Sequence, residues 1–359
     1  MRSFYYGGTD GEPRWVLPRR TPRPGQRGAH SSGAHRDLKR IIRERQRKTG
    51  EAYTTARAQV NRERARLLGL APDEMTTKKR PEPVDAAVLK INRTSARLRI
   101  LADKQEVTLR SGDIWKIVPG HLVTLLIDRR WTWRGDASGR LENPRIDIAK
   151  LGLEPLPLEG GKLDDVASHS EPYRRPDPYA PLWRKLTAKP RPSFEFDGIA
   201  WGALPGYDDD ENPTCDAAEL REAGDDEGAQ NLLMEALGQD LRCLDAHAHL
   251  GNIEFDWSPK RASLHYEIGV KIGELSLPAG FNGLLIWERL YNRPFLRCLH
   301  GYGLCLWRLR RTTEAQQVFE RMLSLNPNDH QGVRFCWQDL REGRSWEEMH
   351  EAENPDPVA

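Results

Sequence analysis

Apolar positions change their spacing along the chain and divide it into three patterned regions. Between residues 85 and 150 they alternate in short runs separated by Asp, Gly and Pro, which is typical of β-strands. From Asp226 almost to the C-terminus they recur at intervals of three and four residues, which indicates amphipathic helices. A shorter helical pattern covers residues 37–68 and is interrupted at Thr49-Gly50. We therefore expect a multidomain protein.

The middle region predicts a small all-β barrel over residues 85–155. Five or six short strands fit into it, with Trp115, Trp131 and Trp133 available to fill the core. The run Arg129–Arg134 also alternates basic and aromatic residues, as a surface that binds oligonucleotides does. Because a small barrel needs large core residues, the core interpretation of the tryptophans is favoured.

The N-terminal part is basic and mostly polar. Residues 1–34 are rich in Arg, Pro and Gly and predict a disordered arm. Residues 35–70 predict a basic helical pair, and residues 71–84 a linker. The second helix is expected to face its partner with Tyr53, Ala56, Val60 and Leu67.

A long segment between the barrel and the C-terminal helices has no clear period. Residues 156–225 are first Pro-rich and then acidic, and are expected to form a linker. Within it, Phe194, Phe196, Ile199 and Trp201 predict a tether packed on a neighbouring domain. The tail, residues 351–359, is expected to fray.

The clearest motif covers residues 299–327. Tyr302-Gly303 is followed by Ala315 and Phe319, and Asn326-Pro327 ends the unit. Small residues at such positions let the two helices of a hairpin approach closely, and the proline stops the second helix. The arrangement closely resembles the tetratricopeptide repeat, a helical hairpin of about 34 residues with the pattern W-x2-L-G-x2-Y, then A-x3-F, then Pro. The other matched positions are Leu299, Leu306 and Met322.

The same spacing recurs on both sides of this motif. Upstream, Leu250-Gly251 and Phe255 begin another hairpin, and residues 229–236 match the second helix of a preceding one. An insertion at about residues 277–294 separates the two full repeats. We predict an all-α stack of tetratricopeptide-like hairpins over residues 226–350, with a generic helical bundle as the alternative. Downstream, the positions of Leu299, Tyr302 and Leu306 recur as Val333, Cys336 and Leu340.

The resemblance implies a protein-binding module that uses the concave face lined by the first helix of each hairpin. In the family, this face binds peptide segments of partner proteins. Flat apolar groups beside arginines fit a partner with acidic and aromatic side chains. The acidic segment 207–227 of the same chain is an alternative occupant. The candidate partner-binding residues are Asn252, Phe255, Arg297, His300, Leu304, Trp307, Arg308 and Arg334.

Charge is distributed unevenly in this chain of 359 residues. Residues 1–80 hold 20 Lys or Arg and 8 Asp or Glu, whereas residues 193–230 hold 12 acidic residues and one Arg. A basic segment suits nucleic acid, the chain's own acidic segment, or solvent. Residues 37–68 weakly resemble the helices of ribbon-helix-helix and antitoxin-like DNA-binding modules, although AHSSGAHR is a poor match for the required preceding strand. The candidate nucleic-acid contacts are Arg40, Arg43, Arg47, Lys48 and Arg57.

Chemistry-bearing residues do not form a recognisable catalytic or metal-binding motif. Glu159-Gly-Gly-Lys162 lacks the spacing of a phosphate-binding loop, and the five cysteines do not suggest a disulfide framework. We expect no metal and no cofactor, and a cytoplasmic protein with no membrane segment. The predicted function is that of an adaptor or scaffold; the alternatives are a nucleic-acid-associated regulator and an unrecognised enzyme with accessory repeats. The residues that could bind a metal by their type, but whose spacing argues against it, are Cys243, His247, His249, His265, Cys298, His300 and Cys305.

Overall fold

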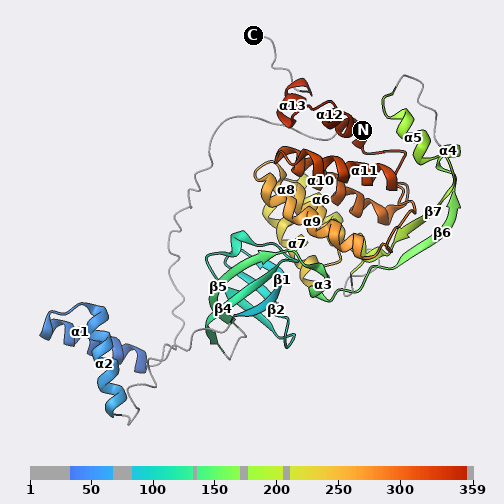
Figure 1. Ribbon diagram of the computed structural model, residues 1–359. Helices are drawn as coiled ribbons and strands as arrows, with labels where there is room; N and C mark the ends of the chain where they lie inside the picture. Colours follow the sequence, from blue (N-terminus) through green and yellow to red (C-terminus); the bar gives the residue numbers. More distant parts are fainter. Residues whose placement is uncertain (1–32, 68–82, 132–135, 170–176, 205–210, 354–359) are drawn as a thin grey trace. The chain divides into compact units, whose positions relative to one another are not determined.

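The computed structural model describes residues 33–67, 83–131, 136–169, 177–204 and 211–353, in two units that divide at residues 78 and 79 (Figure 1). The predicted disordered arm lies outside the described residues, except that its last two residues begin the first helix. Most of the predicted linker 71–84 and the end of the tail also lie outside them. The two units are described separately below.

The first unit is a pair of helices, as predicted. Helix α1 (Gly33–Thr49) and helix α2 (Tyr53–Leu67) are separated at Gly50, whose φ of 69° suits glycine and ends α1. Ile42, Ala56 and Val60 form the small apolar core between them. The prediction that Tyr53 faces inward was wrong: it is the first residue of α2, beyond the reach of this core, and is exposed.

The second unit begins with a closed five-stranded barrel, which confirms the prediction of a small β-barrel. The strand order around it is β1-β2-β3-β5-β4. All neighbouring strands are antiparallel except β3 and β5, which run parallel and close the barrel. The strands are β1 (Val84–Asn92), β2 (Ser95–Ile100), β3 (Glu106–Arg110), β4 (Leu122–Trp131) and β5 (Asp136–Arg145), with a short 3-10 helix η2 (Ile114–Lys116) between β3 and β4.

Small and branched aliphatic residues fill the barrel, so the expectation of tryptophans in its core was wrong for Trp115. That side chain is on η2 and is 66% exposed. The side chain of Trp131 and all of Trp133 lie outside the described residues. A five-stranded barrel has a narrow interior that such aliphatic residues can fill without an indole. The barrel core includes Ala86, Val88, Leu98, Leu109, Ile117, Val123 and Leu125.

Strand β1 is buried on both faces because it belongs to two cores. Ala86 and Val88 point into the barrel, whereas Ala87 and Leu89 join the core of the helical region. Helix α7 (Asp226–Gln239) packs against this outer face of β1. Lys90 also forms an ion pair with Glu235 of α7. The barrel and the helices therefore form one folding unit.

The segment predicted as a linker, residues 156–225, contains regular structure, so that prediction was wrong for its described residues. Strands β6 and β7 form an antiparallel ribbon with a bulge at Gly160. A Cβ at Gly160 would lie 2.4 Å from the carbonyl oxygen of Ser193. Glycines and prolines that suggest a loop are thus sites of close strand approach. The segment contains β6 (Leu158–Asp164), α4 (Val166–His169), α5 (Ala180–Leu186), β7 (Arg191–Phe196) and η3 (Gly198–Ala200), and the short helix α3 (Ile148–Leu151) precedes it.

The aromatic tether predicted within this segment is confirmed. The ring of Phe196 packs edge-on against Phe295, with 5.4 Å between centroids, and Phe194 lies equally close to Phe281. Backbone bonds also join β7 to Leu284 in the insertion that precedes α10. The ribbon is therefore fixed on the helical region.

Antiparallel helices form the C-terminal region, as predicted (Figure 1). The sequence prediction placed its start at residue 226 and missed α6, which begins after Asn212; the Asn212 side chain accepts a hydrogen bond from the Thr214 amide. Within the described ranges, no helix has the length and apolar character needed to cross a bilayer. The other helices of this region are α6 (Pro213–Glu222), α8 (Leu244–Phe255), α9 (Pro259–Leu275), η4 (Leu290–Asn292), α10 (Arg293–Arg308), α11 (Thr312–Leu325), α12 (Val333–Arg341) and α13 (Trp346–Glu353).

Two successive hairpins pack in the same way. In α8–α9, a Cβ at Gly251 would lie 2.5 Å from the ring of Tyr266. In α10–α11, a Cβ at Gly303 would lie 2.3 Å from the ring of Phe319. Each hairpin therefore places a glycine of its first helix against an aromatic ring of its second, at the positions that the repeat pattern predicts.

We expect Gly303→Leu to lower the free energy of unfolding by roughly 1–3 kcal/mol or more, because the new side chain must displace Phe319 from a full core. Denaturant unfolding followed by circular dichroism measures the effect. Gly112→Leu is the matched control, since nothing lies within 4 Å of a Cβ at Gly112. Equal stability of the two variants would contradict the close approach of α10 and α11.

Candidate functional site

The candidate partner-binding residues lie on α8, α10 and α12, and the structure divides all of them except Arg334 into three groups. Residues at one end of this face contact the segment that contains Trp201. Residues at the opposite end contact α13. Between them, a smaller group remains open to solvent.

At the first end, Arg297 is fixed by a buried carboxylate. Its guanidinium lies 2.7 Å from Asp245, whose side chain is 2% exposed. Thr214 also donates to Asp245 at 3.1 Å, and His249 lies 3.5 Å away. Burial alone would raise the pKa of Asp245, but His249 and Arg297 outweigh it and hold that pKa below its ordinary value. The charge of Arg297 is thus matched within the chain.

Two indole rings complete the surroundings of Arg297. Its guanidinium lies 5.4 Å from the ring centroid of Trp201 and 5.8 Å from that of Trp287. Trp287 belongs to the insertion between α9 and α10, which therefore covers this end of the face. Arg297 is a link between segments and offers little to a partner.

At the opposite end, α13 covers three of the candidate residues. The ring of Trp346 lies 5.6 Å from Trp307 and 5.9 Å from Phe255, both edge-on. The guanidinium of Arg308 lies 4.7 Å from the Phe255 ring and 5.4 Å from the Trp346 ring. The described part of the acidic segment 207–227 instead forms α6 and the start of α7.

Trp307 is buried, which contradicts the prediction that it faces a partner. It is 1% exposed, and its indole N–H donates to the carbonyl of Arg344 at 3.1 Å. The repeat pattern places this residue on the binding face, but the chain that follows α12 returns across it. Arg334 is likewise engaged, since it pairs with Asp329 at 3.0 Å and Asp177 at 3.3 Å.

The open group lies between these ends. Asn252 is exposed and accepts a hydrogen bond from the Tyr266 hydroxyl at 2.6 Å. Leu304 and His300 are half-buried, and burial lowers the pKa of His300 to about 4. Arg341 of α12 is exposed, with its guanidinium over the ring of Trp337. Asn252 on α8 thus offers a polar contact, Leu304 on α10 an apolar one, and Arg341 on α12 an exposed basic one.

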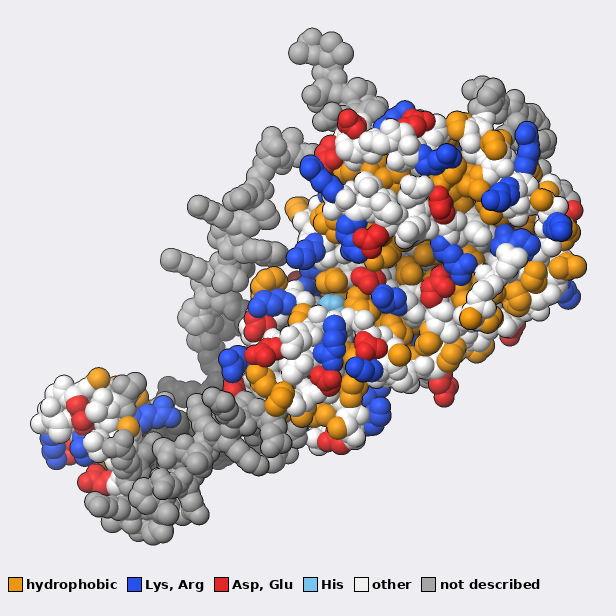
Figure 2. Space-filling model, viewed as in Figure 1, with side chains coloured by type: hydrophobic (Ala, Val, Ile, Leu, Met, Phe, Trp, Pro, Cys, Tyr) orange, Lys and Arg blue, Asp and Glu red, His pale blue; other side chains and the backbone are white. Residues whose placement is uncertain are grey.

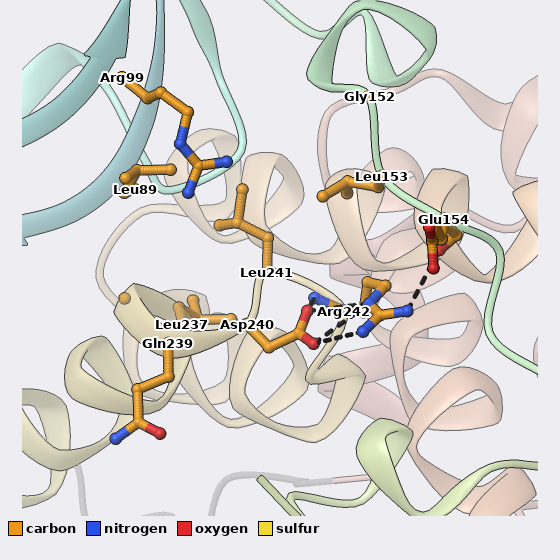
Figure 3. Close-up of a pocket in the computed structure, with 11 residues that line it drawn as sticks. Leu89, Arg99, Gly152, Leu153, Glu154, Leu237, Gln239, Asp240, Leu241 and Arg242 are labelled. Carbon is orange, nitrogen blue, oxygen red and sulfur yellow. Dashed lines mark hydrogen bonds and ion pairs between the residues drawn. The ribbon is translucent and has the colours of Figure 1, made fainter. Parts of the chain in front are cut away.

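A separate cleft of about 320 Å³ lies between the barrel and the helical region (Figure 3). The guanidinium of Arg99 points into it above Leu241, and Arg242 forms paired hydrogen bonds with Asp240 at 2.7 and 3.0 Å. Sequence reasoning missed the cleft because its walls come from β1, β2, residues 152–154 and the end of α7, which no motif connects. The lining residues are Leu89, Arg99, Gly152, Leu153, Glu154, Leu237, Gly238, Gln239, Asp240, Leu241 and Arg242.

Buried histidines gather where the barrel meets α8 and α9. The rings of His247 and His265 lie 6.4 Å apart, and both nitrogens of His265 lack a hydrogen-bond partner among the described residues. His121, from the loop before β4, is also buried and accepts from the Val118 amide at 3.3 Å. Burial, with Arg261 nearby, lowers the pKa of His121 to about 4. These imidazoles are neutral core groups at neutral pH.

The cysteines and histidines named above as candidate metal ligands are distributed over several elements of the described ranges. Within them, no three His, Cys, Asp or Glu side chains are grouped as metal ligands. Burial raises the pKa of the Cys305 thiol to about 12, and it also raises the pKa values of Cys243 and Cys298. These three thiols therefore stay protonated and are poor nucleophiles.

In the N-terminal unit, the candidate nucleic-acid contacts are all exposed. Lys48 pairs with Glu44 at 3.3 Å on α1. The strand that a ribbon-helix-helix module needs before α1 would fall outside the described residues, so that resemblance stays a prediction. The exposed residues are Arg40, Arg43, Arg47, Lys48 and Arg57.

The chain was also compared with known proteins. No protein-family model matches it, and no curated protein is similar to it.

Proposed function

We propose that the protein is an adaptor that binds a partner protein through the open group on α8, α10 and α12, and that its hairpins are of the tetratricopeptide type. The observation that carries the proposal is the repeated packing of Gly251 on Tyr266 and of Gly303 on Phe319. Stacked hairpins of equal geometry present their first helices side by side, which creates an extended surface for a partner.

The chemistry of the open group suits a partner segment with apolar and acidic side chains. Leu304 supplies an apolar contact, Asn252 an amide, and Arg341 a positive charge. On the face shown in Figure 2, acidic and basic side chains are interspersed over the barrel and helices. Recognition on such a surface depends on a few well-placed contacts more than on long-range attraction.

The test is capture of partners from the native cell with the tagged full-length chain. Leu304→Gln with Arg341→Glu is expected to reduce the recovery of the main partner about tenfold, the effect of losing ~1.4 kcal/mol of binding energy. Leu163→Gln with Arg140→Glu is the control, because Leu163 and Arg140 are exposed elsewhere, on β6 and β5. Circular dichroism checks that both variants are folded. Full retention of every partner by the first variant would exclude this face.

The exposed basic residues of α1 and α2 support a second candidate function, that of a nucleic-acid-associated regulator. Arg43 and Arg47 are four residues apart on α1 and therefore lie on one face of it, where they suit contact with phosphates. Because residues 79–359 form a separate unit, deletion of residues 1–70 leaves that unit intact. Salt-sensitive binding of DNA or RNA that this deletion abolishes would support the regulator.

A further inference from the structure

Helix α13 packs on the helical core through two side chains, Trp346 and Met349, and Trp346 makes the aromatic contacts. Trp346, its first residue, lies in a recess formed by Phe255, Trp307 and Arg308, here named the Trp346 socket. Apart from His350 of α13 itself, the described aromatic partners of Trp346 lie at the ends of α8 and α10, and none lies on α12, the preceding helix. Helix α13 therefore lies across the face instead of completing a hairpin with α12.

The segment that carries Trp346 has the features of a short helical ligand. Ser345 and Glu348 cap its start reciprocally: the Ser345 amide donates to Glu348 at 2.7 Å and the Glu348 amide donates to Ser345 at 3.1 Å. Glu347 lies 3.9 Å from Arg310, and both side chains are exposed. The segment thus needs little from the rest of the fold to form its first turn.

The socket is already shaped for an aromatic side chain with acidic neighbours. Arg308 donates to the carbonyl of Phe255 at 2.6 Å, which holds its guanidinium beside the Phe255 ring. That guanidinium meets the indole of Trp346 on one side, and Arg310 supplies a second positive charge at the edge. An indole flanked by carboxylates satisfies the apolar wall and the positive edge together.

We propose that α13 is a resident occupant of the partner site, and that a partner segment with a tryptophan beside acidic residues binds by displacing it. The proposal rests on the adaptor function above and names the chemistry of the partner. Because α13 is tethered to the socket, it competes with a partner segment at an effective concentration of about 1 mM. It therefore excludes partners that bind the socket weakly, whereas a partner that also makes contacts outside the socket can displace it. The neighbouring open group, with Asn252 and Leu304, can supply those contacts.

The probe is a fluorescent peptide with the sequence of residues 344–353, RSWEEMHEAE. It is titrated into the full-length chain and into the Trp346→Ala variant, with binding followed by fluorescence anisotropy. We expect the variant to bind the peptide about tenfold or more tightly than the wild type, because its own segment no longer fills the socket. A chain ending at Gly343 should show the same gain, and serves if Trp346→Ala folds poorly.

Two controls identify the socket as the site of binding. Adding Arg308→Glu to Trp346→Ala is expected to abolish the gain, whereas adding Trp115→Ala, at an indole that is 66% exposed on η2 of the barrel, is expected to preserve it. A peptide with alanine in place of tryptophan should not bind. Equal peptide binding by wild type and Trp346→Ala, or binding that survives Arg308→Glu, would overturn the proposal.

The peptide experiment and the partner-capture experiment test the two proposals separately. If the Leu304→Gln, Arg341→Glu variant loses its cellular partner but no variant binds the peptide, the adaptor function stands and the displacement of α13 fails. If the peptide binds as expected while partner capture is unaffected, the socket is competent but the adaptor surface has been misplaced.

Discussion

Replacing Arg297 with methionine is expected to lower the free energy of unfolding by about 3–5 kcal/mol, the usual cost of leaving a buried charge without its partner. Asp245 is 2% exposed, and Arg297 lies 2.7 Å from it. Thr214 and His249 stay beside the carboxylate, but neither supplies a permanent positive charge. Methionine keeps most of the volume of the arginine stem, so the change isolates the loss of charge.

Urea unfolding followed by tryptophan fluorescence and circular dichroism measures this loss. The double variant Arg297→Met, Asp245→Asn should recover part of the stability, because it removes both the positive charge and the buried negative charge. Arg310→Met is the matched control, since the side chain of Arg310 is 85% exposed and its change should cost little. If Arg297→Met and Arg310→Met unfold at the same urea concentration, the ion pair does not stabilise the fold.

Acidification from pH 7 to pH 5 is expected to destabilise the protein through its buried histidines. Burial lowers the pKa values of His121 and His247 to about 4. In the unfolded chain these imidazoles take up protons below about pH 6.5, whereas in the folded chain they stay neutral until about pH 4. Stability is therefore complete above pH 6.5 and falls as the pH decreases, by about 2 kcal/mol for each of the two histidines at pH 5.

The free energy of unfolding at pH 7, 6 and 5 tests this expectation. His121→Asn and His247→Asn should each flatten the pH dependence below neutral pH, even where they lower stability at pH 7. The control is Gln239→Asn, because Gln239 is exposed and carries no titratable group, so its replacement should leave the slope unchanged. A wild-type stability that is constant between pH 7 and pH 5 would contradict the neutral, buried state of these rings.

The local pattern of the sequence was sufficient to predict the barrel and the helical hairpins. Alternation identified the strands, and Gly303, Ala315 and Phe319 identified a hairpin whose helices do approach closely at the glycine. The local pattern was insufficient to predict helices and strands whose sequences are mostly polar. Helix α6 is acidic and begins with a proline, and β6 contains Gly160 and Gly161, so the sequence pattern of both is typical of a loop.

The candidate site was less predictable because it depends on which segments cover a surface. The repeat pattern placed Trp307 and Arg308 on the binding face, but only the path of the chain after α12 shows that Trp346 covers them. Similarly, the pattern could not show that aliphatic residues suffice for the barrel core and leave Trp115 exposed. The spacing of residues along the chain predicts which side chains meet within one hairpin. It does not predict which distant segment of the chain covers a surface, because such a contact produces no periodic pattern.

The outer face of β1 has a consequence for self-assembly. A stack of hairpins has two apolar ends, to which a second copy can add head to tail and start a filament. Here β1 covers the first end, where Leu89 packs with α7, and Tyr179 covers the last, where its ring meets Trp337 of α12 edge-on at 6.2 Å. The barrel and the Tyr179 segment thus act as terminal caps. A second copy that added head to tail at either end would therefore have to displace one of these contacts.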